Sequence, residues 1–473
     1  MGYTETSTLK KPYIFIMLFV ILSYAIFSYT SLNCRPFSKT PENLYQYLAE
    51  AFLNGQFSFK ILPPPELLKI KDPYNYQQNH LIKFSDGQLL HDKLHDVSLY
   101  KGKFYIYFGP LPVMMIYIPC KLLTGYYPSD CFVVFLFLSL GFFICYSLMI
   151  KIKNDHFPLV SESQMVLAGL LLGFANNAPF LLIRPMVYEV AIASGFFILS
   201  LAIIFLYQIF HENFSTKNVF FFSFFLVLSI AARPNFALLY ILIIPLLFIY
   251  LYHKSKKFLK NAFALIIPGL ILGPLLLYYN YSRFDSIFEF GLHYQLAHVL
   301  SNPVLMTYHM REIAFNILYN FYNYFLSPID FKHSIPYVSF PHLFERKVAF
   351  GNDYEGTIGI LNTAPFLIFL VFLPGILCFS SKLKTPSNYQ LRHFIFFLSF
   401  LTSIILLFIL SLNSATERYT SDFSTFLIML SILCFWLSPK YFNQKSLYFA
   451  ESFFTITCIF SIYIGFILGN YIY

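Results

Sequence analysis

Arginines and acids stand at the ends of several long apolar runs in this chain. A guanidinium group presents a planar fork of donors that matches the oxygens of a phosphate, so these residues could bind an anion. The alternative is that they form structural ion pairs, or reach from helix ends toward water. The residues of this set are Arg184, Glu189, Arg233, Arg283, Arg418 and Asp422.

Four carboxylates in the first polar segment could act as a general base. A carboxylate held close to a hydroxyl group can take its proton during nucleophilic attack. Asp96 and Glu42 are stronger candidates than Asp72 and Asp92, because Asp96 precedes a glycine-containing turn and Glu42 falls in the first turn of a predicted helix. A helix N-terminus keeps a carboxylate ionised. The alternative for each acid is an ordinary solvated position.

The same segment repeats a His-Asp pair after four residues, at His91-Asp92 and His95-Asp96. This spacing could place ligands on one side of a helical turn, so a divalent metal is a weak possibility. A hexapeptide does not define three or four ligands in the geometry that a metal requires. The sequence therefore predicts no metal and no other cofactor.

The composition identifies the type of molecule that must hold these residues. Apolar residues make up 58% of the chain and charged residues 12%, with a mean hydropathy of +0.63. Soluble proteins usually contain about 25% charged residues. A soluble enzyme, a disordered chain and a disulfide-stapled module are therefore excluded. The net charge of +9 is spread over short segments between apolar runs, so it does not predict nucleic-acid binding.

Apolar runs without charges recur along the whole chain. A helix that crosses a bilayer core needs about 20 such residues. We therefore predict an all-α polytopic membrane protein with about eleven transmembrane helices in one membrane-embedded domain, residues 1–473. The runs are 12–30, 131–150, 163–183, 190–210, 218–232, 234–252, 261–282, 357–380, 394–416, 423–439 and 452–473.

The distribution of Lys and Arg predicts the orientation. With the N-terminus inside, the inner segments hold fourteen Lys and Arg against four acids. We therefore expect a plasma-membrane protein with a cytoplasmic N-terminus and an extracytoplasmic C-terminus. Two long segments then face outward, at 32–130 (loop 1) and at 283–356. The six inner segments are 1–11, 151–162, 211–217, 253–260, 381–393 and 440–446.

Loop 1 is expected to carry helices that lie along the membrane surface. Thr40 can cap a helix that Gly55 ends, and one face of this helix is apolar, which is typical of an interfacial helix. The segment 105–124 is too rich in Pro and Gly for a span, so we interpret it as a second juxtamembrane element. Two of Cys34, Cys120 and Cys131 could pair in an oxidising compartment, although unpaired cysteines are the favoured interpretation.

Six segments of the chain match a known pattern: Asp72–Tyr74, Asp96–Pro112, Arg184–Glu189, Ala232–Pro234, Asn280–Gly291 and Arg418–Phe423. In these segments the chain resembles the GT-C glycosyltransferases, polytopic enzymes that take a sugar from a polyprenyl-phosphate carrier. The resemblance implies a polyprenyl-phosphate sugar donor, a glycan or lipid acceptor outside the membrane, and a role in modifying the cell envelope. Where the superfamily usually has an acidic pair before the first amphipathic helix, this chain has Glu42-Asn43.

Two other functions remain open at this point. A transporter or flippase of lipids or glycans would also be a helical bundle, but it would more often carry charges within its spans and helices broken at the midplane. A noncatalytic protein of the same fold would be consistent with the single carboxylate at Glu42. One carboxylate can nevertheless suffice for a transferase, because a phosphate leaves as an anion without needing an acid, unlike the leaving group of a glycosidase.

Overall fold

The computed structural model describes residues 10–31, 34–212, 214–296, 310–333, 337–339, 356–378, 386–412 and 415–470. Within these ranges, seven helices are long and apolar enough to cross a membrane. They confirm the expected all-α membrane protein. These helices are α1 (Lys11–Thr30), α7 (Asp130–His156), α10 (Val187–His211), α12 (Ala237–Lys254, preceded by η3, Pro234–Phe236), α13 (Phe258–Phe284), α17 (Pro386–Ser411) and α19 (Gln444–Leu468).

The other four predicted runs are also helical, but they are shorter or interrupted, so the number of crossings is not established. Proline at the start of a helix and the paired Asn176-Asn177 account for two of the interruptions. The segments are α8 (Glu162–Leu170) with η2 (Leu171–Ala175) and α9 (Ala178–Ile183), α11 (Thr216–Ile230), α15 (Ile360–Thr363) with η7 (Pro365–Phe372) and α16 (Leu373–Cys378), and α18 (Ser424–Leu437), which η10 (Ser438–Tyr441) follows.

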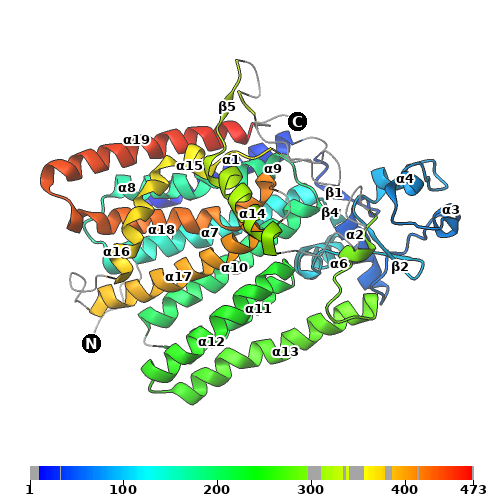
Figure 1. Cartoon of the computed structure of the whole chain (residues 1–473), viewed down its shortest axis with the longest axis horizontal. Coiled ribbons are helices and arrows are strands. Elements are labelled where there is room, and N and C mark those ends of the chain that lie inside the picture. The colour runs from blue at the N-terminus through cyan, green and yellow to red at the C-terminus, as the bar shows by residue number, and fades with distance from the viewer. Residues whose placement is uncertain are drawn as a thin grey trace.

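The long helices run side by side in one bundle, and the described part of loop 1 gathers at one end of it (Figure 1). We call this the loop-1 end. At the opposite end, Lys10 Nζ lies 2.5 Å from Glu162 Oε1, which brings the start of α1 next to the start of α8. The segments with the Lys and Arg excess that the structure describes lie at this opposite end, as the sequence predicts for one side of a membrane.

Loop 1 is closed at its base by two contacts between its first and last residues. Strand β1 (Phe37–Ser38) pairs with β4 (Tyr127–Pro128), and Cys34 forms a disulfide with Cys131. The favoured interpretation of unpaired cysteines was therefore wrong for these two, while Cys120 is free. The two cysteines are 97 residues apart in the sequence, so the sequence alone does not show that they lie close enough to pair.

Between these ends, loop 1 folds into short elements. The first is α2 (Leu44–Leu53), whose N-cap is Asn43, since the Asn43 side chain accepts a hydrogen bond from the backbone N–H of Gln46. The expected cap at Thr40 is therefore wrong, and Glu42 precedes the helix. The remaining elements are α3 (Pro65–Lys69), α4 (Tyr76–Asn79), α5 (Leu90–Lys93), the hairpin of β2 (Ser98–Tyr100) and β3 (Lys103–Tyr105), and η1 (Val113–Tyr117) with α6 (Ile118–Thr124).

The second outer segment and the turn before α18 supply the other elements of the loop-1 end. Helix α14 (Met310–Phe321) packs against α17 and continues as η6 (Tyr322–Leu326), which packs against α15. The 3-10 turn η9 (Glu417–Asp422) leads into α18. The smaller elements are η4 (Leu292–Tyr294), β5 (Asp330–Phe331) and β6 (Val338–Ser339).

Candidate functional site

Arg233 and Asp422 form a buried ion pair at the loop-1 end. Arg233 follows α11, and its side chain lies against Gly195 of α10. A Cβ added at Gly195 would come 2.8 Å from Arg233 Cγ. The Arg233 guanidinium donates a hydrogen bond to the Asp422 carboxylate. Burial raises the pKa of the Asp422 carboxyl, and Arg233 opposes that shift. The buried Nε of Arg233 has no hydrogen-bond partner within the described residues.

Arg418 lies beside this pair and is held by aromatic rings. Its Cζ atom is 4.1 Å from the ring centroid of Tyr188 on α10 and 5.9 Å from that of Tyr419. The Cζ of Arg233 is 5.7 Å from the same Tyr419 ring. Two guanidinium groups therefore share one ring, and rings of this kind attract cations through their faces. The arrangement concentrates positive charge where an anion could bind.

Asp96 is the predicted general base that lies near these cations. It is 6% exposed and has a positive φ of 59°, which Asp tolerates better than most residues. Its Oδ2 lies 3.5 Å from His95 Nε2. Burial and, after it, the Asp96 carboxylate raise the pKa of the Tyr107 phenol, while Arg418 and Arg233 oppose that shift. Asp96 and the two arginines therefore each act electrostatically on Tyr107.

The β2–β3 hairpin and the segment after it bring Tyr107 to the arginines. The backbone N–H of Leu111 donates to the carbonyl oxygen of Ala231 at 3.1 Å. A Cβ on Gly109 would lie only 1.9 Å from that same oxygen, so the close approach of the two segments requires glycine. Loop 1 is in this way fixed directly against the end of α11, two residues before Arg233.

Two further buried carboxylates lie at the starts of neighbouring helices. The backbone N–H of Met186 donates to Glu189 Oε2 at 3.1 Å, which caps α10. Asp130, in the first turn of α7, accepts a hydrogen bond from the Tyr117 hydroxyl at 2.5 Å and interacts electrostatically with Glu189. The sequence pattern does not distinguish Asp130, because an acid after Ser129 is typical of an ordinary helix start.

The other predicted residues have different surroundings. Arg283 is buried, and it donates to the carbonyl oxygen of Ile106 at 2.5 Å and to Asn280 Oδ1 at 2.7 Å, so it positions loop 1. Glu42 is exposed, and Asp72 accepts from the backbone N–H of Tyr74 in a surface turn. Arg184 is half-buried after the last residue of α9.

The described residues do not support a metal site at the two His-Asp pairs of loop 1. His91 Nε2 lies 2.7 Å from Asn79 Oδ1, whereas His95 pairs with Asp96, and Asp92 is exposed. Over the described ranges, no group of three His, Cys, Asp or Glu side chains could hold a metal ion. The two histidines thus take different partners.

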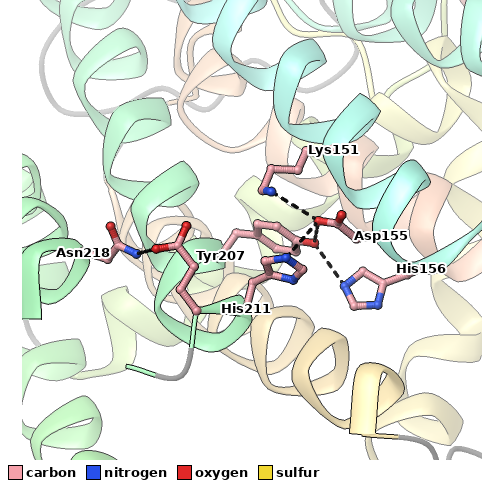
Figure 2. A network of polar contacts seen from close by, with 7 residues as sticks. Lys151, Asp155, His156, Tyr207, His211 and Asn218 are labelled. Carbon is pink, nitrogen blue, oxygen red and sulfur yellow. Dashed lines mark hydrogen bonds and ion pairs between the residues drawn. The ribbon is translucent and has the colours of Figure 1, made fainter. Parts of the chain in front are cut away.

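A second polar network ties α7 to α10 at the opposite end of the bundle (Figure 2). The Tyr207 hydroxyl donates to Asp155 Oδ2 at 2.7 Å and lies 3.1 Å from His156 Nε2. Lys151 Nζ and His211 Nε2 are 3.5 Å and 3.6 Å from the same carboxylate oxygen. Because its members bond to one another, we interpret this network as structural.

Comparison with known proteins extends the description of the fold. No family model matches the sequence, and no curated protein matches it either. The apo oligosaccharyltransferase of Archaeoglobus fulgidus matches with a TM-score of 0.51 and 13% identity, over 98% of this chain and 56% of that one. The oligosaccharyltransferase AglB of Archaeoglobus fulgidus, in complex with an inhibitory peptide and a dolichol-phosphate, matches with a TM-score of 0.45 and 11% identity, over 97% and 55%.

The first of these matches shows that the chain has the GT-C fold expected from the sequence. The chain spans only about 56% of the length of that oligosaccharyltransferase. At this level of identity the likeness concerns the arrangement of the helices. The activity must therefore be argued from the residues at the loop-1 end.

Proposed function

We propose that this protein is a membrane glycosyltransferase that moves a sugar from a polyprenyl-phosphate carrier to an acceptor hydroxyl at the loop-1 end, outside the membrane. The observation that carries the proposal is that the Tyr188 ring lies 4.1 Å from Arg418 Cζ and 6.5 Å from the ring of His95, whose Nε2 is 3.5 Å from Asp96 Oδ2. Cations suited to a phosphate and a carboxylate suited to a hydroxyl proton then lie together. The GT-C fold supports the same function, and a glycan or lipid of the cell envelope is the acceptor class we propose.

The proposed reaction needs one base and one anion site. The acceptor oxygen attacks the anomeric carbon, the bond from that carbon to the phosphate oxygen breaks, and polyprenyl phosphate leaves with the electron pair. Asp96 takes the acceptor proton. Arg418 and Arg233 stabilise the charge that develops on the departing phosphate. Tyr188 and Asp422 act as positioning residues, because each holds one arginine.

Arg418→Ala should weaken binding of polyprenyl phosphate to the protein in nanodiscs. Losing a charge-assisted hydrogen bond costs about 1.5–3 kcal/mol, which corresponds to roughly 10- to 100-fold. The measurement is a titration of polyprenyl phosphate by native mass spectrometry. Arg392→Ala is the matched control, because Arg392 lies near the start of α17 at the opposite end and should bind as the wild type does. Equal affinities for all three proteins would contradict the proposed anion site.

Asp96→Asn should abolish most transfer while leaving polyprenyl-phosphate binding intact, because removing a general base lowers a rate by about 10²–10⁴-fold. The assay follows radiolabelled sugar from a panel of polyprenyl-phosphate sugars into envelope glycans and lipids. Glu42→Gln serves as the control, since Glu42 is exposed and outside α2. Movement of the labelled lipid across the bilayer without glycoside formation would support the flippase instead.

A further inference from the structure

Among the described side chains of helix α14 and its continuation η6, three asparagines are buried and four large apolar residues are exposed. Asn316, Asn320 and Asn323 are at most 2% exposed. The Asn320 amide donates to the carbonyl oxygens of Leu410 and Leu412 at 3.0 and 2.7 Å, and the Asn316 amide donates to that of Ser411 at 3.3 Å. These carbonyls at the end of α17 lack helical partners. The asparagines therefore fix which face of α14 points outward.

The outward face is a continuous apolar stripe. Phe315, Leu318, Phe321 and Leu326 are 53%, 72%, 44% and 47% exposed. Their spacing follows the helical period, so they lie along one face over about 16 Å, at 1.5 Å per residue. In Figure 1, α14 runs obliquely to the bundle helices at the loop-1 end. Because the hydrogen bonds of the asparagines hold this apolar face outward, the face is suited to contact an apolar ligand.

One end of the stripe meets the turn that carries Arg418. The Tyr324 hydroxyl accepts a hydrogen bond from the backbone N–H of Thr416 at 3.0 Å, directly before η9. The Phe325 ring stacks on Phe423, directly after η9, with centroids 6.3 Å apart. The end of η6, which carries Leu326 of the stripe, therefore packs against the turn that carries Arg418. An amphiphile with an apolar chain and an anionic head has the complementary pattern.

We infer that the stripe of α14 and η6 carries the isoprenoid chain of the donor, with the phosphate directed toward Arg418. This inference rests on the proposed function, because it assigns the chain of the same carrier lipid. A soluble partner would need polar positions around its apolar contact, whereas the stripe borders the membrane-spanning bundle. The chain-length preference of the protein then resides in α14 rather than in the anion site.

Leu318→Asn tests this assignment by comparing a long and a short isoprenoid phosphate. Its affinity for polyprenyl phosphate in nanodiscs should fall about 10-fold, the effect of losing one buried leucine contact, while its affinity for isopentenyl phosphate stays unchanged. Leu318→Met should bind both as the wild type does. The control is Leu123→Asn, because Leu123 of α6 is 86% exposed and lies on another helix of loop 1.

The outcomes separate this inference from the proposed function. If Arg418→Ala lowers both affinities but Leu318→Asn lowers neither, the anion site stands and the stripe is not the chain site. If Leu318→Asn weakens phosphatidylglycerol as much as polyprenyl phosphate, the stripe is a general bilayer contact and the inference is wrong. If the wild type binds neither isoprenoid phosphate, the proposed function and the inference fall together.

Discussion

Two guanidinium groups share the Tyr419 ring, and one of them is paired with a carboxylate that is almost fully buried. The sequence could point to Arg233, Arg418 and Asp422, because a charge at the end of an apolar run must find a partner or water. It could not separate them from Arg283. That arginine bonds to the carbonyl oxygen of Ile106, 177 positions away, and only the folded chain brings the two together.

Asp422→Asn should reduce stability by about 3–5 kcal/mol, because it leaves the Arg233 charge buried without its counter-charge. The double variant Arg233→Met/Asp422→Leu should recover much of that loss, since it removes both charges. The measurement is the free energy of unfolding in detergent. Asp285→Asn is the control, because its pair with Lys101 is exposed and should contribute nothing detectable. Equal losses at the two sites would show that Asp422 does not hold Arg233.

At the level of elements, hydropathy located the helices better than it located their ends. Each of the eleven predicted runs is mostly helical where the structure describes it, because lipid requires backbone hydrogen bonds to close within each segment. Hydropathy did not predict the break in the helix at Asn176-Asn177, where the Asn176 amide donates hydrogen bonds to a backbone carbonyl oxygen and to Thr425. It also misplaced the cap of α2, since Thr40 and Asn43 are both suitable capping residues.

Gly109→Ala should detach loop 1 from the end of α11. The new methyl group would lie 1.9 Å from the Ala231 carbonyl oxygen, so the backbone must move and the hydrogen bond from Leu111 is lost. We expect a lower thermal unfolding temperature and loss of transfer activity, because Tyr107 and Asp96 reach the arginines through this contact. Gly273→Ala on α13 is the matched control. A Cβ at position 273 would meet no atom within 4 Å. Replacing glycine by alanine inside a helix also lowers the free energy of the helix by up to about 1 kcal/mol. A wild-type melting curve for Gly109→Ala would contradict the close approach.

At the scale of the whole molecule, composition predicted a polytopic helical bundle and the resemblance of its motifs implied the GT-C fold, which the match to the Archaeoglobus fulgidus oligosaccharyltransferase confirms. The orientation in the membrane stays a prediction. The closure of loop 1 by the Cys34–Cys131 disulfide is consistent with an oxidising compartment at the loop-1 end. Composition could not reveal this closure, because pairing depends on which cysteines the fold brings together.

Two free cysteines allow the orientation to be tested without adding any reporter. Cys120, on α6, lies at the loop-1 end, whereas Cys378, the last residue of α16, is exposed and lies at the opposite end. Single-thiol variants that keep the Cys34–Cys131 disulfide should therefore differ toward a membrane-impermeant maleimide. Cys120 should react in intact cells, and Cys378 should react only after permeabilisation.

The disulfide gives the same experiment an internal check. Cys34 and Cys131 should react with the maleimide only after reduction, because an oxidised pair has no thiolate to attack the reagent. Labelling of Cys378 but not Cys120 in intact cells would invert the topology and place Arg233, Arg418 and Asp96 on the cytoplasmic side. Labelling of both thiols in intact cells would mean that α16 ends on the same side as loop 1. The number of membrane crossings between them would then be even instead of odd, and the span count from the apolar runs would be wrong.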